Sequence, residues 1–277
     1  MPDQMLNIGA STLQHGHDSS RVYLMELADA DMPGLLPKVN VLAKQQGYGK
    51  IFAKVPGHWV SDFTNDGFAT EAMVPGFYMG NENGHFMGKY LTPDRAHDPH
   101  GEEINKILSV ARETGVRRAP DPIEPYTARV CTADDCQEMA ACYRSIFPSY
   151  PFPVHDPAFL AATMAEHVTY FGIWHGKELA ALASAEQYQR SGHVEMTDFL
   201  TMPAHRRQGL AGTLLATMDR ELTRHGITMA YTIARALSFG MNITFARAGY
   251  RHGGTLINNT QICGRIESMQ VWYKQLL

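Results

Sequence analysis

Apolar residues in the first third of the chain follow two spacings, one typical of helices and the other of strands. Residues 35–46 place apolar side chains three and four positions apart and end at Gly47, which suits a helix C-cap. Residues 51–55 form a short apolar run that Pro56-Gly57 ends, which predicts a strand. The same patterns predict a strand at 21–26, a helix at 59–65, and strands at 70–78 and 85–91 joined by a loop at 80–84. We expect residues 1–20 to form a flexible or edge segment.

From residue 126 onward, strands and helices alternate. The predicted elements are a strand at 127–131, helices at 136–147 and 157–167, strands at 169–174, 179–187 and 193–202, a helix at 210–225, a strand at 229–234, a helix at 238–248, and strands at 253–258 and 267–273. Elements in this order predict an α/β fold with one mixed (α+β) central sheet. Residues 93–125 hold one helix at 103–114 and end in Pro120-Asp121-Pro122, which indicates a connecting segment. We therefore predict domains at 1–92 and 126–277, joined by residues 93–125.

Two parts of the chain share one order of elements. Residues 36–91 and 215–275 both run helix, glycine turn, strand, helix, Phe-x-x-x-Gly-aromatic, strand, strand. The shared motif is Phe63 to Phe68 in the first part and Phe245 to Tyr250 in the second. The alternative is chance similarity between two regions of the same class. We favour a duplication in which the first copy is truncated.

Composition limits the functions that the chain can have. Hydrophobic residues make up 44% of its 277 residues and charged residues 19%, the balance of an ordinary globular protein. The net charge of −4 provides no broad basic face for nucleic acid. No apolar run approaches the roughly 20 residues that span a bilayer, and residues 1–20 do not resemble a signal peptide. We expect a cytoplasmic protein with neither nucleic acid nor membrane as partner. The cysteines form no C-x-x-C pair and are expected to be buried side chains: Cys131, Cys136, Cys142 and Cys263.

The strongest chemical signal is a strand, a loop and a helix over residues 193–225. The strand ends before Pro203, and the helix begins with Arg206-Arg207-Gln208-Gly209-Leu210-Ala211, an R-x-x-G-x-A motif. A helix N-terminus offers unpaired N–H groups and the positive end of the helix dipole, which together bind a pyrophosphate. Gly209 has no Cβ, so phosphates can approach the backbone, and Arg206 or Arg207 can add a charged hydrogen bond. The motif alone is common at helix starts, but its place between a strand and an amphipathic helix makes it specific.

This segment, together with the strand–helix region about forty residues downstream, resembles motifs A and B of the GNAT acetyltransferase superfamily. The resemblance covers residues 126–277 and, in weaker form, 36–91, which would then be a truncated GNAT-like half-repeat. It implies an enzyme that transfers the acetyl group of acetyl-CoA to an amine. It also implies that the motif A strand separates from its neighbour at 199–201, where its N–H groups bind the pantetheine arm and polarise the acetyl carbonyl. The residues that the resemblance places at acetyl-CoA are Phe199, Leu200, Thr201, Arg206, Arg207, Gln208, Gly209, Leu210, Ala211, Gly212, Thr213 and Ser238.

In that superfamily an acidic residue near the start of the motif A strand often acts as general base, and Glu195 holds that position. A base is needed because a lysine-like ammonium with a pKa of about 10.4 is neutral in only about one molecule in 2,500 at pH 7. Asp198, placed on the opposite strand face by simple alternation, is the second candidate. One position departs from the family pattern. Phe245 stands where many members have the Tyr that protonates the leaving thiolate, so the general acid is not identified.

Further stretches are similar to the β-lysine N-acetyltransferase family and extend the resemblance over almost the whole chain. They lie at 50–56, 74–78, 86–90, 234–242, 254–264 and 267–274. This similarity implies acetylation of the ε-amine of β-lysine, the product of lysine 2,3-aminomutase, and hence a functional link to that enzyme. The product, Nε-acetyl-β-lysine, is a net-neutral compatible solute for osmoadaptation, because acetylation removes one positive charge.

The acceptor site is less well defined by the sequence. Each polar candidate could equally be a turn cap or a ladder side chain: Tyr78, Glu186, Asp198, Asn242, Asn258 and Asn259. The segment around Tyr78 is the part of the N-terminal half that we expect to reach the acceptor. Histidines such as His15, His17 and His85 lie in unrelated segments without ligand spacing, so we expect no metal. The alternatives left open are another small amine or a protein lysine as acceptor, and a low-turnover acyl-CoA sensor. A homodimer also stays open.

Overall fold

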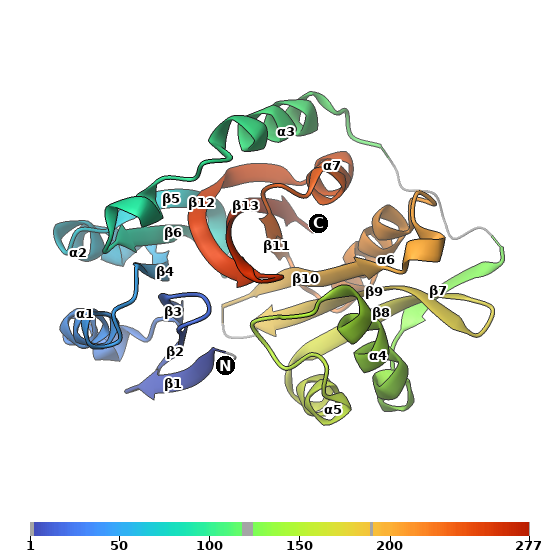
Figure 1. Cartoon of the computed structure of the whole chain (residues 1–277), viewed down its shortest axis with the longest axis horizontal. Coiled ribbons are helices and arrows are strands. Elements are labelled where there is room, and N and C mark those ends of the chain that lie inside the picture. Colours follow the sequence, from blue (N-terminus) through green and yellow to red (C-terminus); the bar gives the residue numbers. More distant parts are fainter. Residues whose placement is uncertain (1–2, 118–123, 189–190, 277) are drawn as a thin grey trace. The chain divides into compact units, whose positions relative to one another are not determined.

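The computed structural model describes residues 3–117, 124–188 and 191–276 and has the mixed α/β architecture expected from the sequence (Figure 1). It divides into two compact units. The first comprises Met1–Asn105, Ser149–Phe152 and Gly253–Val271, and the second comprises Lys106–Pro148, Pro153–His252 and Trp272–Leu277. The predicted end of the connecting segment at Pro120-Asp121-Pro122 lies outside the described residues. Among the described residues, none of the helices has the length and apolar character needed to cross a membrane.

The first unit is a hydrogen-bonded sheet with helices on one face. Its strands lie in the order β1-β2-β3-β4-β6-β5-β12. The segment 1–20 was expected to be flexible or an edge, and its described part contributes the hairpin β1–β2 at the sheet edge. The elements are β1 (Gln4–Ile8), β2 (Ser11–Gly16), β3 (Arg21–Glu26), η1 (Asp29–Asp31), α1 (Leu35–Gln45), β4 (Lys50–Pro56), η2 (Gly57–Trp59), α2 (Val60–Asn65), β5 (Ala69–Tyr78), β6 (Glu82–Tyr90), η3 (Pro93–Ala96) and β12 (Arg251–Ile262).

Every residue of β4 is buried, because both faces of this strand are covered. Ile51, Ala53 and Val55 pack in one apolar cluster with Leu36 and Val39 of α1. The alternate positions, which include Lys50, point to the opposite face. At the edge of this sheet β12 pairs with β5, and this pairing explains why residues 253–271 group with the N-terminal residues rather than with the part of the chain that precedes them.

The second unit is a sheet with helices on both faces. Its elements are β7 (Tyr126–Val130), η4 (Ala133–Asp135), α4 (Cys136–Ile146), α5 (Pro157–Glu166), β8 (Val168–His175), β9 (Glu178–Tyr188), β10 (His193–Thr201), η5 (Pro203–His205), α6 (Leu210–Arg224), β11 (Met229–Arg235) and α7 (Phe239–Arg247). Helix α3 (Gly101–Glu113) and strand β13 (Arg265–Gln275) each pass from one unit into the other, and β12 has its first two residues in the second unit.

Alternation along β9 sets the two faces of the second sheet. Ala181, Ala183 and Ala185 lie in one cluster with Leu214 and Met218 of α6. The intervening positions, which include Leu182, face the other side, where Figure 1 shows α4 and α5. Helix α6 begins a short loop, residues 206–209, after η5, which follows the end of β10, so the sheet sets where the α6 N-terminus lies.

The structure repeats one set of contacts in the two copies of the half-repeat. Strands β2-β3-β4-β6-β5 and β9-β10-β11-β13-β12 follow the same order, and both β3–β4 and β10–β11 are parallel. In each copy the second helix ends with a bond from the aromatic residue after the glycine to the preceding phenylalanine: Phe68 N to Phe63 O at 3.0 Å, and Tyr250 N to Phe245 O at 3.1 Å.

The relative positions of the aromatic rings of these residues are also the same in the two copies. The Phe63 and Phe68 centroids are 5.0 Å apart at 70°, and those of Phe245 and Tyr250 are 5.1 Å apart at 71°. A lysine from the last strand lies over the second ring in each copy, Lys89 over Phe68 at 5.7 Å and Lys274 over Tyr250 at 5.6 Å. Agreement at this level favours the GNAT-like half-repeat over chance similarity.

Candidate functional site

The loop between β10 and α6 has the backbone form that an anion site requires. Arg207 has a φ of 66° and Gly209, the N-cap of α6, has a φ of 74°. A Cβ built on Gly209 would meet no atom within 4 Å, so the space beside this backbone is open. The first N–H groups of α6 have no intrahelical partner and face that space. The loop therefore presents donors and the positive end of a 15-residue helix to a ligand.

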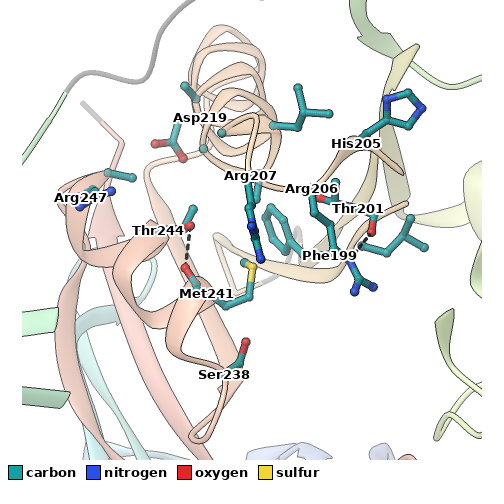
Figure 2. A pocket seen from close by; sticks show the side chains of 18 of the residues that line it. Phe199, Thr201, His205, Arg206, Arg207, Asp219, Ser238, Met241, Thr244 and Arg247 are labelled. Carbon is teal, nitrogen blue, oxygen red and sulfur yellow. Dashed lines mark hydrogen bonds between the residues drawn. The ribbon is translucent and has the colours of Figure 1, made fainter. Parts of the chain in front are cut away.

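A cavity of about 1060 Å³ opens at this loop, between α6 and α7. Figure 2 shows the Arg207 side chain directed from the loop into it, while Met241 and Thr244 approach from α7. The described residues that line it are Val116, Arg117, Ile146, Phe147, Phe199, Leu200, Thr201, His205, Arg206, Arg207, Gly209, Leu210, Ala211, Gly212, Ala216, Asp219, Arg220, Arg235, Ser238, Gly240, Met241, Thr244, Arg247, Ala248 and Lys274.

The cavity is strongly cationic although the chain as a whole is acidic. Among the described residues, six arginines and Lys274 line it, against one carboxylate, Asp219. The Nζ atom of Lys274 lies 2.7 Å from Asp219 Oδ2, and the Tyr250 hydroxyl donates to Asp219 Oδ1 at 2.7 Å. Burial raises the pKa of Asp219, and these two contacts oppose the shift. The excess of positive charge fits a ligand with several phosphate groups.

Strand β10 separates from β11 as expected. The parallel pairing of these strands covers only His193 to Glu195, opposite Met229 to Tyr231. Beyond Glu195, β10 continues to pair with β9 as far as Thr201. Met202 N donates to Ala180 O of β9 at 2.9 Å, so alternation along the strand directs the N–H of Leu200 toward β9 and that of Thr201 into the gap. Phe199, Leu200 and Thr201 all line the cavity.

The two candidate bases lie on the same face of the sheet, which corrects the expectation from alternation. A bulge interrupts the β9–β10 register between Thr197 and Leu200, and Asp198 has a φ of 57°. Asp198 thereby turns toward β9, where Ser184 Oγ donates to its Oδ2 at 2.5 Å. Ser184 and Glu186 project to the same side as Glu195, because Glu186 is directly opposite Glu195.

Glu195 is 9% exposed, and the Tyr231 hydroxyl donates to its Oε2 at 2.6 Å. Glu186 is its cross-strand neighbour, and Oε1 of Glu186 lies 3.5 Å from Nε2 of His167. Two carboxylates directly opposite each other repel unless a cation lies between or beside them. The face formed by Glu186, Glu195 and Asp198 is thus suited to a cationic ligand.

The other acceptor candidates have varied surroundings. Asn242 is fully buried, donates to Arg235 O at 3.1 Å and Ser238 O at 2.8 Å, and accepts from Trp272 Nε1 at 2.9 Å. Because the Asn242 amide makes these hydrogen bonds within the fold, we do not place Asn242 at the acceptor site.

The remaining three candidates belong to the first unit. Asn258 has a φ of 44° and donates to the carbonyls of Arg95 and His97 at 3.2 and 2.8 Å, a structural use of its amide. Asn259 is 1% exposed, and its Nδ2 donates to Thr260 Oγ1 at 3.4 Å. Burial raises the pKa of the Tyr78 hydroxyl, so this group stays a neutral hydrogen-bonding phenol. Its acceptor role stays a prediction.

Of the twelve residues predicted at acetyl-CoA, the cavity lining includes all except Gln208 and Thr213. Thr213 is buried and Gln208 is exposed. Phe245 is fully buried, and its ring lies 5.5 Å from Phe199 and 5.1 Å from Tyr250. It therefore supports the fold of the site rather than its proton transfers.

The sequence reasoning missed one side of the cavity. The cavity is lined by Gly240, Met241, Thr244 and Arg247 of α7 and by Ala248 at its C-cap, at spacings of three and four residues that define one face of a helix. That spacing is visible in the sequence, but only the known position of α6 says which face is turned to the ligand. Arg117 comes from the region expected to be a connecting segment.

Comparison with known proteins agrees with this geometry. Residues 136–250 match the Acetyltransferase (GNAT) family. The chain is 32% identical to beta-lysine N(6)-acetyltransferase of Methanococcus maripaludis, over 98% of both chains. It is 30% identical to N-acetyltransferase YodP of Bacillus subtilis over 96% of both chains. It is 28% identical to beta-lysine N(6)-acetyltransferase of Methanosarcina mazei, over 86% of this chain and 95% of that protein.

Proposed function

We propose, from the premise that this chain belongs to the GNAT acetyltransferase family and is an acetyl-CoA-dependent N-acetyltransferase, that its acceptor is the ε-amine of β-lysine. The observation that carries the proposal is the pairing of two unlike surfaces in the second unit. A cavity lined by six arginines and a lysine lies on one side of β10, and three carboxylates lie on one face of the same strand and its neighbour.

The cationic cavity suits the phosphates of acetyl-CoA. The α6 N-terminus and Arg207 bind the pyrophosphate, and the open space at Gly209 lets it reach the backbone. The apolar residues Phe147, Phe199 and Met241 offer packing for the pantetheine arm. The N–H groups of the 199–201 segment that face away from β9 hold the thioester and polarise its carbonyl.

Glu195 accepts the proton that the substrate ammonium must lose before its nitrogen attacks the thioester carbonyl. The Tyr231 hydroxyl orients the Glu195 carboxylate through the 2.6 Å hydrogen bond. The amine nitrogen then forms the amide bond as the carbon–sulfur bond of the thioester breaks, and CoA leaves as thiolate or thiol. Asp198 is the second candidate for the base.

The acidic face favours a substrate with more than one positive charge. β-Lysine carries two ammonium groups and one carboxylate, so Glu186 can pair with the ammonium that does not react. Two relatives that match most of the chain bear the name beta-lysine N(6)-acetyltransferase. Tyr78 and Asn259 remain proposed contributors from the first unit. A link to lysine 2,3-aminomutase and the formation of a compatible solute follow from this substrate and form part of the proposal.

A panel of amines tests the substrate. Release of the CoA thiol is measured with β-lysine, α-lysine, spermidine and a lysine-containing peptide at equal concentrations. The proposal predicts the highest kcat/KM for β-lysine, by at least tenfold. A preference for spermidine or the peptide would reject β-lysine while leaving the acetyltransferase assignment intact.

A further inference from the structure

We propose that His175, Glu178 and His205 form a binding site for one divalent transition-metal ion of the zinc type in the second unit. The three side chains bring one ligand atom each to within 4.8 Å of one another. The site is separate from the acidic face around Glu195 and does not depend on the identity of the acceptor.

The β8–β9 turn brings the first two ligands together. His175 ends β8 and Glu178 begins β9, and the two are paired directly opposite each other. The turn between them is tight, with Gly176 at a φ of 61°. Directly opposite residues of an antiparallel pair project to the same face, so both side chains leave the sheet on the same side. His205 arrives from η5, far along the chain.

The distances suit a tetrahedral ion. Nε2 of His205 lies 3.6 Å from Oε2 of Glu178. Zinc bonds of about 2.1 Å in tetrahedral geometry separate two ligand atoms by about 3.4 Å, so this pair needs only a small adjustment. The rings of His175 and His205 have centroids 5.2 Å apart. A ring nitrogen of His175 lies within 4.8 Å of the other two ligand atoms, and because this side chain is exposed, its ring is free to turn toward a third coordination position.

The burial and the hydrogen bonding of His205 suit a metal ligand. It is 7% exposed, and among the residues that the structure describes its Nε2 has no hydrogen-bond partner. Its Nδ1 lies 3.1 Å from the Tyr126 hydroxyl. When Nδ1 carries the proton and donates to Tyr126, Nε2 presents its lone pair toward Glu178. An outer hydrogen bond of this kind fixes the tautomer and orientation of metal-binding histidines.

The donor set selects the class of ion. Two imidazoles and one carboxylate match zinc and its neighbours, whereas Mg²⁺ and Ca²⁺ prefer oxygen ligands alone. His175 and Glu178 are exposed, so a water molecule can complete the coordination. The alternative is a plain ion pair between protonated His205 and Glu178, which would need neither His175 nor a metal.

The location of this site, beside the cofactor loop, gives a bound ion the role of holding that loop in position. His205 precedes Arg206 and Arg207 of the cofactor loop and also lines the cavity. Figure 2 shows its ring directed away from these two arginines. An ion held there would tie η5 to the β8–β9 turn behind the loop, so it would stabilise the loop without touching the reacting groups.

Calorimetric titration of the metal-stripped full-length protein with Zn²⁺ tests the proposal. We expect one ion per chain, no comparable binding of Mg²⁺, and a higher melting temperature in the presence of Zn²⁺. His175→Ala and Glu178→Gln should each raise the Zn²⁺ Kd at least tenfold. Both residues are exposed, so these variants should fold.

His225→Ala is the matched control, because His225 also lies close to a carboxylate, with Nε2 3.1 Å from Glu221 Oε1, on an exposed surface. It should leave the Zn²⁺ affinity unchanged. Absence of stoichiometric Zn²⁺ binding to the wild type would overturn the proposal. Unchanged affinity in both His175→Ala and Glu178→Gln would also overturn it, because binding would then lie elsewhere.

Discussion

At the scale of single residues, the chemistry depends on how Glu195 is enclosed. A carboxylate that is 9% exposed and accepts a 2.6 Å hydrogen bond from Tyr231 keeps a fixed orientation on its strand. A fixed orientation matters because a general base must reach the proton that it removes within hydrogen-bond distance, or through one water. Phe245 supplies no proton, so the departing thiolate takes its proton from another source or leaves as the anion.

Glu195→Gln removes the base with almost no change in shape. We expect kcat/KM to fall about 100-fold at pH 7, with partial recovery as pH rises and more of the substrate amine is already neutral. Steady-state rates between pH 7 and 10 measure this. Asp198→Asn serves as comparison and should cost less. A larger loss for Asp198→Asn, with a near-normal Glu195→Gln rate, would transfer the role to Asp198.

Gly209→Asp places a carboxylate where the pyrophosphate approaches. The acetyl-CoA Kd measured by calorimetry should rise at least tenfold, since like charges meet at the α6 N-terminus. Gly226→Asp is the matched control at the other end of α6. Gly226 has a φ of 80° and, like Gly209, open space at its Cβ position, so it carries similar backbone strain. Equal effects of the two substitutions would mean that strain, not the phosphate site, explains the loss.

Most of the cofactor loop could be predicted from the sequence, because R-x-x-G-x-A encodes a local structure that needs no distant partner. Asp198 could not be placed correctly, because its direction depends on a bulge opposite β9. His175, Glu178 and His205 could not be grouped at all. Their proximity comes from a turn and a 3-10 helix that no short motif connects.

At the scale of elements, β4, β5 and β12 share a buried ion pair. Lys50 is fully buried, and its Nζ lies 2.8 Å from Glu71 Oε2 and donates to Ile257 O at 2.7 Å. The Tyr90 hydroxyl also donates to Glu71. Burial lowers the pKa of Lys50 to about 8, although the nearby Glu71 carboxylate opposes the shift. The pair joins three strands at one point.

Lys50→Met should reduce the free energy of unfolding by about 3 kcal/mol at pH 7, because it leaves Glu71 buried without its cation. The pH dependence has a defined sign. Between the folded pKa of about 8 and the unfolded value of 10.5, the unfolded chain binds more protons at Lys50, so this residue makes wild-type stability rise with pH in that window. Urea unfolding at pH 7 and 10 measures both effects.

Lys44→Met, at an exposed position of α1, is the control for loss of a lysine charge and should change stability little. A Lys50→Met protein within about 1 kcal/mol of wild type at pH 7 would show that the pair contributes nothing.

The predicted bounds of the last strands were too short for a physical reason. β12 extends to Ile262, four residues beyond the predicted end, through Asn258, Asn259, Thr260 and Gln261. Polar residues of this kind usually indicate a turn. Here hydrogen bonds within the first unit hold them in the strand: Arg95 Nε donates to Asn258 O at 2.7 Å, and Arg21 Nη1 donates to Asn259 O at 2.8 Å.

At the scale of the whole molecule, the connection that precedes the second copy of the repeat is the cofactor loop, and the connection that precedes the first copy is acidic. Residues 202–209 join β10 to α6 and contain Arg206 and Arg207. Residues 27–34 join β3 to α1 and contain Asp29 and Asp31, which hydrogen-bond within the first unit to Trp59 and Ser11. Carboxylates at this place repel phosphate.

The chain should therefore bind one acetyl-CoA, not two, despite its two copies. Calorimetric titration gives the stoichiometry directly, and Gly209→Asp should weaken the single site without revealing a second. A stoichiometry of two per chain would mean that the first copy kept the ancestral binding function.

The position of the new amide bond tests the central claim most directly. After incubation of β-lysine with acetyl-CoA, NMR of the product identifies which nitrogen carries the acetyl group, and thiol titration counts the CoA released. The account predicts acetylation at the ε-nitrogen alone, with one CoA released per acetyl group transferred. Acetylation at the β-amine, or no acetylated β-lysine while another amine is consumed, would contradict it.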